Sequence, residues 1–89
     1  MRNLYKKVLK RCFSRFVIRR RDALQLTQEQ MAEILNISGR SYADLEREKT
    51  APSGLSLAIY LAYLCEDPGK LAQELRIAFD AESENIAQI

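Results

Sequence analysis

The chain has 89 residues, of which 47% are apolar, and a formal net charge of +2. This length suits one domain with a single modest core. The sequence has no histidine, no glycine-rich phosphate loop, and two cysteines, Cys12 and Cys65, without the close spacing of metal ligands. Histidine is the usual general base and a frequent metal ligand. We therefore expect no enzyme and no metal or cofactor site, and we interpret both cysteines as free thiols.

Basic residues are concentrated at the N-terminal end. Residues 1–21 contain nine arginines or lysines and no acid, whereas residues 22–49 contain three basic and six acidic residues, and residues 50–89 two and six. A polyanion should therefore approach the N-terminal end. Apolar residues between the basic ones predict an amphipathic, extended first helix over about residues 3–24. Such a helix can also lie on a membrane or serve as a transit peptide. We favour inward packing of its apolar side, because the later segments need a helix to cover them.

Residues 28–47 predict two short helices joined by a tight turn. Thr27 and Gln30 fit a capping box for the first of these helices, over about residues 28–35. Apolar residues then recur at helical spacing in both halves of the segment.

The turn between these helices has its own signals. Asn36 tolerates the left-handed conformation that ends a helix, and Ser38 can cap the next helix, over about residues 39–48. This layout presents the start of the second helix to the major groove of DNA.

The C-terminal half predicts two further helices. Residues 54–65 contain an apolar run that is long and rich in leucine and alanine, as in a central buried helix. Asp67 and Pro68 give the fifth helix a cap and a proline in its first position. Its buried stripe consists of residues four apart: Leu71, Leu75 and Phe79. Residues from about 82 have little to pack against, and we expect them to fray. The pattern predicts an all-α fold in which residues 1–89 form one compact five-helix domain.

Residues 26–53, LTQEQMAEILNISGRSYADLEREKTAPS, resemble the DNA-binding core of the Cro and repressor type of helix-turn-helix regulators, the xenobiotic-response-element (XRE) family. The matching positions occur in the family's order and spacing: Leu26-Thr27-Gln28, Met31-Ala32, Leu35, Ile37-Ser38, Leu45-Glu46 and Pro52-Ser53. The resemblance covers about residues 13–65. It implies a lambda-repressor-like bundle of about five helices, and relatives usually bind operator DNA as homodimers.

The resemblance also implies roles for single residues. Thr27 and Gln28 match positions that hold a DNA phosphate, and Lys49 lies in a loop that commonly approaches the DNA backbone. Arg21 and Glu46 match a pair that forms an internal salt bridge between the first and third helices. The helix at about residues 39–48 matches the family's recognition helix, the one that enters the DNA groove. Its start and exposed face comprise Ser38, Gly39, Arg40, Ser41 and Asp44.

The recognition helix departs from the family pattern. Gly39 stands where many relatives have a long polar side chain for base reading. Asp44 points an acid toward the groove, where it can accept from cytosine but also repels phosphates. Arg40 alone suits bidentate recognition of guanine. Glu48 replaces a usual glycine, and we expect the helix to be longer by a turn as a result. The basic N-terminal run would then supply much of the attraction to DNA.

Simpler roles stay open for these residues. Thr27 and Gln28 can act only as helix caps, Arg40 can be an ordinary surface charge, and Asp44 can face solvent. Tyr42 can belong to the core or to an interface.

The resulting hypothesis is a small, cytoplasmic, repressor-like transcriptional regulator that binds double-stranded DNA sequence-specifically through the helix at 39–48. We expect a homodimer through the fourth and fifth helices, with no membrane association and no small-molecule ligand domain. The residues expected at this interface are apolar: Tyr60, Tyr63, Leu75 and Phe79. The alternative is a protein-interaction or antitoxin-like module with little DNA binding of its own. Gly39 and Asp44 favour that alternative, while the basic N-terminus opposes it.

Overall fold

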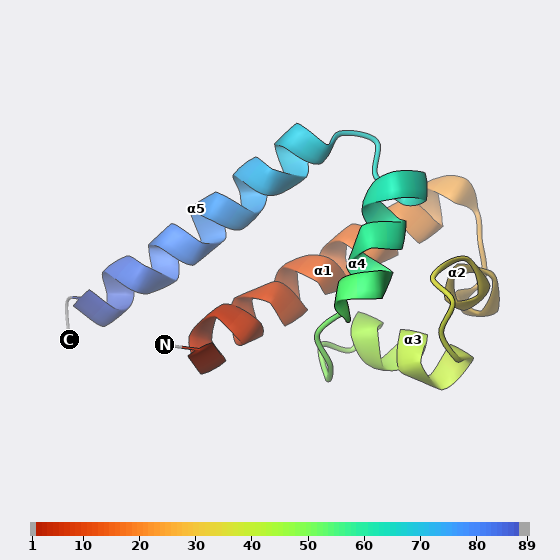
Figure 1. Cartoon of the computed structure of the whole chain (residues 1–89), viewed down its shortest axis with the longest axis horizontal. Helices are drawn as coiled ribbons and strands as arrows, with labels where there is room; N and C mark the ends of the chain where they lie inside the picture. Colours follow the sequence, from red (N-terminus) through yellow and green to blue (C-terminus); the bar gives the residue numbers. More distant parts are fainter. Residues whose placement is uncertain (1, 88–89) are drawn as a thin grey trace.

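The computed structural model describes the backbone of residues 2–87 and the side chains of residues 4–83. All regular structure in this part of the chain is helical, which confirms the expected all-α fold of five helices (Figure 1). The elements are α1 (Arg2–Leu24), α2 (Gln28–Ile34), α3 (Gly39–Glu46), α4 (Gly54–Ile59), the π-helical turn η1 (Tyr60–Leu64) and α5 (Pro68–Ala87). None of these helices is long and apolar enough to cross a membrane.

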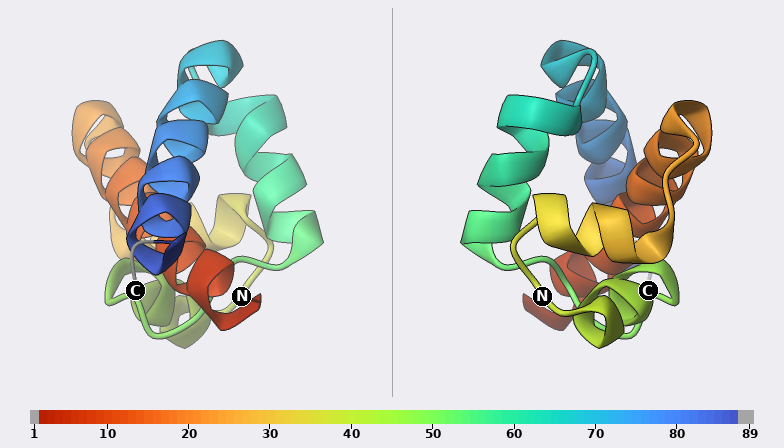
Figure 2. Two further views of the ribbon diagram at one scale, coloured as in Figure 1. Left: turned by 90° about the vertical axis from the view of Figure 1, so that its left-hand side faces the viewer. Right: turned by 90° about the vertical axis from the view of Figure 1, so that its right-hand side faces the viewer.

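The first and last helices form a long antiparallel pair, and α2, α3 and α4 surround the C-terminal half of α1 (Figures 1 and 2). The rings of Tyr5 and Phe79 meet edge to face with centroids 5.3 Å apart. Fraying was expected from about residue 82, and in the structure α5 extends to Ala87. Its last turns have a partner in α1: the hydroxyls of Tyr5 and Ser83 lie 3.1 Å apart, and Arg11 Nη2 lies 3.5 Å from Glu82 Oε1.

The core lies where α1 crosses the three short helices. Val17, Leu35 and Tyr42 are fully buried, and the rings of Phe13 and Tyr60 meet edge to face with centroids 5.2 Å apart. Both cysteines are free thiols, and Cys12 is part of the core. Burial of these side chains from α1 agrees with the inward packing favoured for the first helix.

The helix expected over residues 54–65 differs from the expectation in two ways. It is α-helical only to Ile59 and then widens into η1, where the Cys65 N–H donates to the Tyr60 carbonyl at 2.9 Å. Only one face of this segment is buried. Tyr60 is in the core, but the side chain of Tyr63 is 80% exposed and that of Leu55 61%. The apolar run therefore covers the core on one side and faces solvent on the other.

Three of the helices end in the same way. A residue with a left-handed backbone follows each of α1, α2 and α3 within two positions. Its φ is 57° at Gln25, 59° at Asn36 and 63° at Glu48. In each case the next N–H bonds back across the last turn, from Leu26 to Arg21 O, from Ile37 to Ala32 O and from Lys49 to Asp44 O. These are Schellman motifs, which usually use glycine.

The expectation that Glu48 lengthens the recognition helix is therefore wrong. α3 ends at Glu46, and Glu48 takes the left-handed conformation that a glycine would occupy. The two bonds of the motif, from the Glu48 N–H to Leu45 O at 3.2 Å and from the Lys49 N–H to Asp44 O at 2.9 Å, stop the helix despite the side chain. They offset the steric cost of a Cβ in this region.

Candidate nucleic-acid interface

The carboxylate of Glu46, on the last turn of α3, joins three helices. Arg21 of α1 donates to it twice, from Nε to Oε2 at 2.6 Å and from Nη2 to Oε1 at 3.1 Å. Gln28 of α2 donates from Nε2 to Oε1 at 2.9 Å, and the Tyr42 hydroxyl donates to Oε2 at 2.5 Å. The Glu46 side chain is only 8% exposed, so these donors replace water around a buried charge.

Ser14 of α1 adds a bond to the backbone at the same place. Its hydroxyl donates to the Glu46 carbonyl at 2.6 Å, and its side chain is buried. Sequence reasoning did not identify this hydrogen bond, since a serine within a basic amphipathic helix carries no signal for it. It also missed the bond of the Tyr42 hydroxyl, although Tyr42 and Glu46 stand four residues apart on one helix.

The network changes the acid–base properties of its members. Burial alone would raise the pKa of Glu46, but the hydrogen bonds from Arg21, Tyr42 and Gln28 outweigh burial and hold this pKa below its ordinary value. The hydrogen bond to Glu46 raises the pKa of Arg21. Burial, together with the bond to Glu46, raises the pKa of Tyr42. The carboxylate is therefore charged, and the tyrosine neutral, throughout the physiological range.

The start of α2 is capped by its own residues. The Thr27 hydroxyl accepts from the Gln30 N–H at 3.1 Å, and the Gln30 side chain accepts from the Thr27 N–H at 2.8 Å, so the expected capping box is present. Thr27 itself is exposed. The side-chain amide of Gln28, expected at a phosphate, is half-buried and bonded to Glu46.

The start of α3 is open to solvent. Ser38 accepts from the Ser41 N–H at 3.1 Å, as expected of a cap, and the hydroxyls of the two serines lie 3.0 Å apart. Gly39 and Arg40 are exposed beside them, and no atom lies within 4 Å of the position a Cβ would take at Gly39. Among the residues that the structure describes, the Arg40 side chain has no hydrogen-bond or ion-pair partner. It is therefore available to a ligand that approaches α3.

Asp44 is held by a residue that sequence reasoning did not single out. Arg47 Nη2 lies 2.8 Å from Asp44 Oδ1, and the side chains of Arg47 and Asp44 are 58% and 25% exposed. The three-residue spacing was the available signal. The pair neutralises the acid on this face while the protein is free. Lys49 follows in the exposed connection, and its backbone N–H is used to end α3.

The basic residues of α1 fall into two groups. Arg19 and Arg20 pair with acids of the C-terminal segment, at 3.4 Å to Glu74 Oε2 and 2.7 Å to Glu66 Oε1, and Arg11 pairs with Glu82 as described above. Arg21 is bound to Glu46. The lysines in the first half of the helix, and Arg15, have no such partner among the described side chains. The positive charge of α1 that is free to attract a polyanion is therefore smaller than the number of its basic residues suggests.

Within the described part of the chain, no group of three histidine, cysteine or acidic side chains converges as metal ligands would. Instead, the first turn of α3 is exposed, and the hydrogen bonds to Glu46 attach the last turn of this helix to α1 and α2.

A helix-turn-helix family model matches residues 17–64, more than half of the chain. The protein therefore belongs to the helix-turn-helix family of the XRE type, with a lambda-repressor-like fold. No individual curated protein and no solved structure matches the chain significantly. Domains of this family are DNA-binding modules of transcriptional regulators and are typically non-enzymatic. The first half of α1 and the whole of α5 lie outside the matched region.

Proposed function

We propose that the protein is a small, repressor-like transcriptional regulator that binds specific double-stranded DNA sequences, with α3 lying in the major groove. The observation that carries this proposal is the set of hydrogen bonds to Glu46. They fix α3 against α1 and α2, while its first turn, with Gly39, Arg40 and Ser41, stays exposed. A rigid helix with a free outer face is what reading base edges requires.

The residues of the interface take different roles. Arg40 recognises a guanine through two parallel hydrogen bonds. Asp44 accepts from a cytosine amino group once Arg47 turns toward a phosphate. Thr27, Ser38 and Ser41 position the backbone, as does Lys49 in the connection after α3. Gln28 contributes mainly by holding Glu46, since its side-chain amide is already bonded there.

One recognition helix covers half of a typical operator, which supports a homodimer. The interface expected on the fourth and fifth helices needs revision, because Tyr60 is in the core and Leu75 and Phe79 are partly buried against it. The large apolar side chains left exposed on these elements are Leu55, Leu61, Tyr63 and Ile77. We propose that two copies meet through side chains of this set, with Tyr63, the most exposed of them, at the contact. Replacing Tyr63 by aspartate should then give monomers in sedimentation whose circular dichroism is still that of a folded helical protein.

The experiment that tests DNA binding is selection of preferred duplexes from a random library, followed by titration of Arg40→Ala on the selected site. Loss of this arginine should cost about 1–3 kcal/mol on the selected site and relax the preference at one base pair. If the selected duplexes share no common sequence, the alternative of a protein-interaction module is favoured. The absence of a side chain at Gly39 also supports that alternative.

A further inference from the structure

The N-terminal half of α1 has a charged face that the family's DNA-binding core does not include. The matched region begins at residue 17, and α1 begins well before it, at Arg2. Three lysines lie on this extension: Lys6, Lys7 and Lys10. Lys6 and Lys7 are exposed and Lys10 is half-buried. Among the side chains that the structure describes, no acid pairs with any of them, in contrast to Arg11, Arg19 and Arg20.

The position of these lysines follows from helical spacing. Lys7, Lys10, Ser14 and Arg21 are separated by three, four and seven residues, so they share one face of α1. Ser14 and Arg21 both bond to Glu46 at the end of α3. Lys10 and Lys7 therefore lie one and two turns beyond the point where α3 ends and the connection over residues 47–53 begins.

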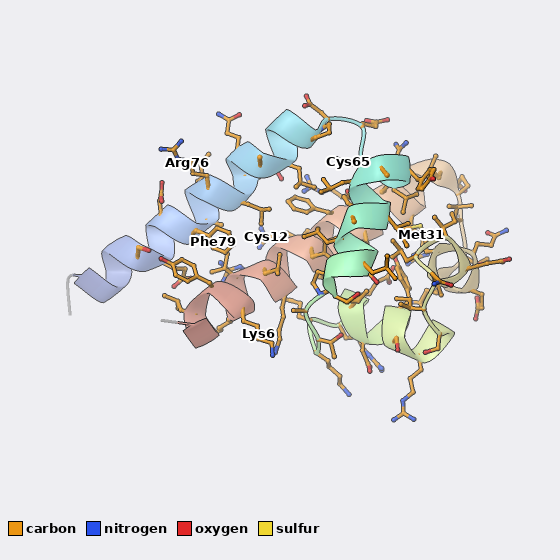
Figure 3. All side chains as sticks on the ribbon, in the orientation of Figure 1. Lys6, Cys12, Met31, Cys65, Arg76 and Phe79 are labelled. Carbon is orange, nitrogen blue, oxygen red and sulfur yellow. The ribbon has the colours of Figure 1, made fainter. Side chains whose placement is uncertain are left out.

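The figures agree with this placement. The connection after α3 passes beside the N-terminal half of α1, both in Figure 1 and in the views of Figure 2 turned by 90°. Lys6 points to the edge of the molecule along which α3 lies, whereas Arg76 projects from the opposite edge (Figure 3). Arg15, which also has no acidic partner among the described side chains, borders the groove between α1 and α5 instead.

We propose that Lys6, Lys7 and Lys10 bind the DNA backbone at a second place, on phosphates that flank the segment read by α3. This inference rests on the proposed function and extends it, because the binding residues belong to a part of α1 outside the family's core. Ammonium groups without acidic partners release counterions when they meet phosphates, so they add affinity without sequence preference.

Arg11, Arg19 and Arg20 do not take part. Their charges are compensated by Glu66, Glu74 and Glu82, which a phosphate would have to displace. The structure thus assigns the attraction to one face of α1 and not to its whole basic sequence.

The test compares two double variants that change the net charge equally. Lys7→Gln/Lys10→Gln removes two charges from the proposed face. The control, Lys70→Gln/Arg76→Gln, removes two from α5, where Arg76 forms only an exposed 3.9 Å pair with Asp80. The probe is a random-sequence DNA duplex of about three helical turns, titrated by fluorescence anisotropy at several salt concentrations. Circular dichroism should show unchanged folding of both variants, because none of the four side chains belongs to the core.

The logarithm of the binding constant of the wild type should fall linearly with the logarithm of salt concentration. The slope should become shallower by about 0.9 for each phosphate that is no longer neutralised, hence by up to about two units in Lys7→Gln/Lys10→Gln. The control should change the slope much less. Equal changes in the two variants would mean a general effect of net charge and would overturn the proposal, as would an unchanged slope in the lysine variant. If the wild type itself does not bind the duplex, the proposed function fails and this inference falls with it.

Discussion

Arg21 Nε lies 2.6 Å from Glu46 Oε2, and this ion pair joins the first helix to the end of the third. The Glu46 side chain is 8% exposed and that of Arg21 27%, so the pair is largely but not fully shielded from water. The same carboxylate accepts from Tyr42 and Gln28. One acidic side chain thus ties α3 to both α1 and α2.

Removal of either partner should destabilise the fold. We expect Arg21→Ala and Glu46→Ala each to lower the free energy of unfolding by about 2–3 kcal/mol, somewhat less than for fully buried pairs, because Arg21 stays partly hydrated. Urea denaturation measures the effect. Arg19→Ala is the matched control, since its pair with Glu74 is exposed and should contribute less than about 1 kcal/mol. Equal losses of stability in Arg19→Ala and Arg21→Ala would show that the network has no special role.

The network should also make stability depend on pH. The folded-state pKa of Glu46 is lowered, so the ionised form stabilises the fold above the pKa of the unfolded chain, ordinarily about 4.3. This contribution should be lost as the pH falls from there through the lower pKa of the folded state. The difference in unfolding free energy between the wild type and Glu46→Gln should therefore be constant near neutral pH and shrink in acid. A difference that does not change between neutral and strongly acidic pH would contradict the assigned pKa direction.

The left-handed residue after α3 offers a stabilising substitution. Glu48 has φ of 63°, a conformation that costs a residue with a Cβ about 1 kcal/mol relative to glycine. Glu48→Gly should raise the free energy of unfolding by about that amount. Arg47→Gly is the control, because Arg47 has φ of −88°, where glycine brings only added freedom in the unfolded chain and should destabilise. Thermal melts of the two variants should move in opposite directions. A lower melting temperature for Glu48→Gly would refute this account.

Neutralising Asp44 on the recognition helix should strengthen non-specific binding, measured on duplex DNA of random sequence. In Asp44→Asn, one negative charge near the phosphates is removed and Arg47 is released from its ion pair. The salt dependence of binding to a random duplex should then become steeper by about one unit, because Arg47 can neutralise one more phosphate. Asp80→Asn is matched in charge and also removes a partner of an arginine, but it lies on α5. An equal gain in both variants would show that only the net charge matters.

Much of the local structure of this protein was readable from the sequence alone. The capping box of Thr27, the left-handed turn at Asn36, the cap at Ser38 and the start of α5 after Asp67 all depend on residues within a few positions of each other. Such signals do not require knowledge of the rest of the fold. The same holds for the helix-turn-helix family, whose pattern lies in one continuous segment.

The tertiary structure decided which side chains far apart in the sequence form hydrogen bonds and ion pairs with each other. Whether the Gln28 amide was free for a phosphate depended on Glu46, 18 positions away. Which charges of α1 were compensated depended on acids far along the chain, such as Glu66 and Glu82. A sequence pattern reports which groups can pair, but charge compensation and burial depend on which of them meet in space, and only packing brings them together.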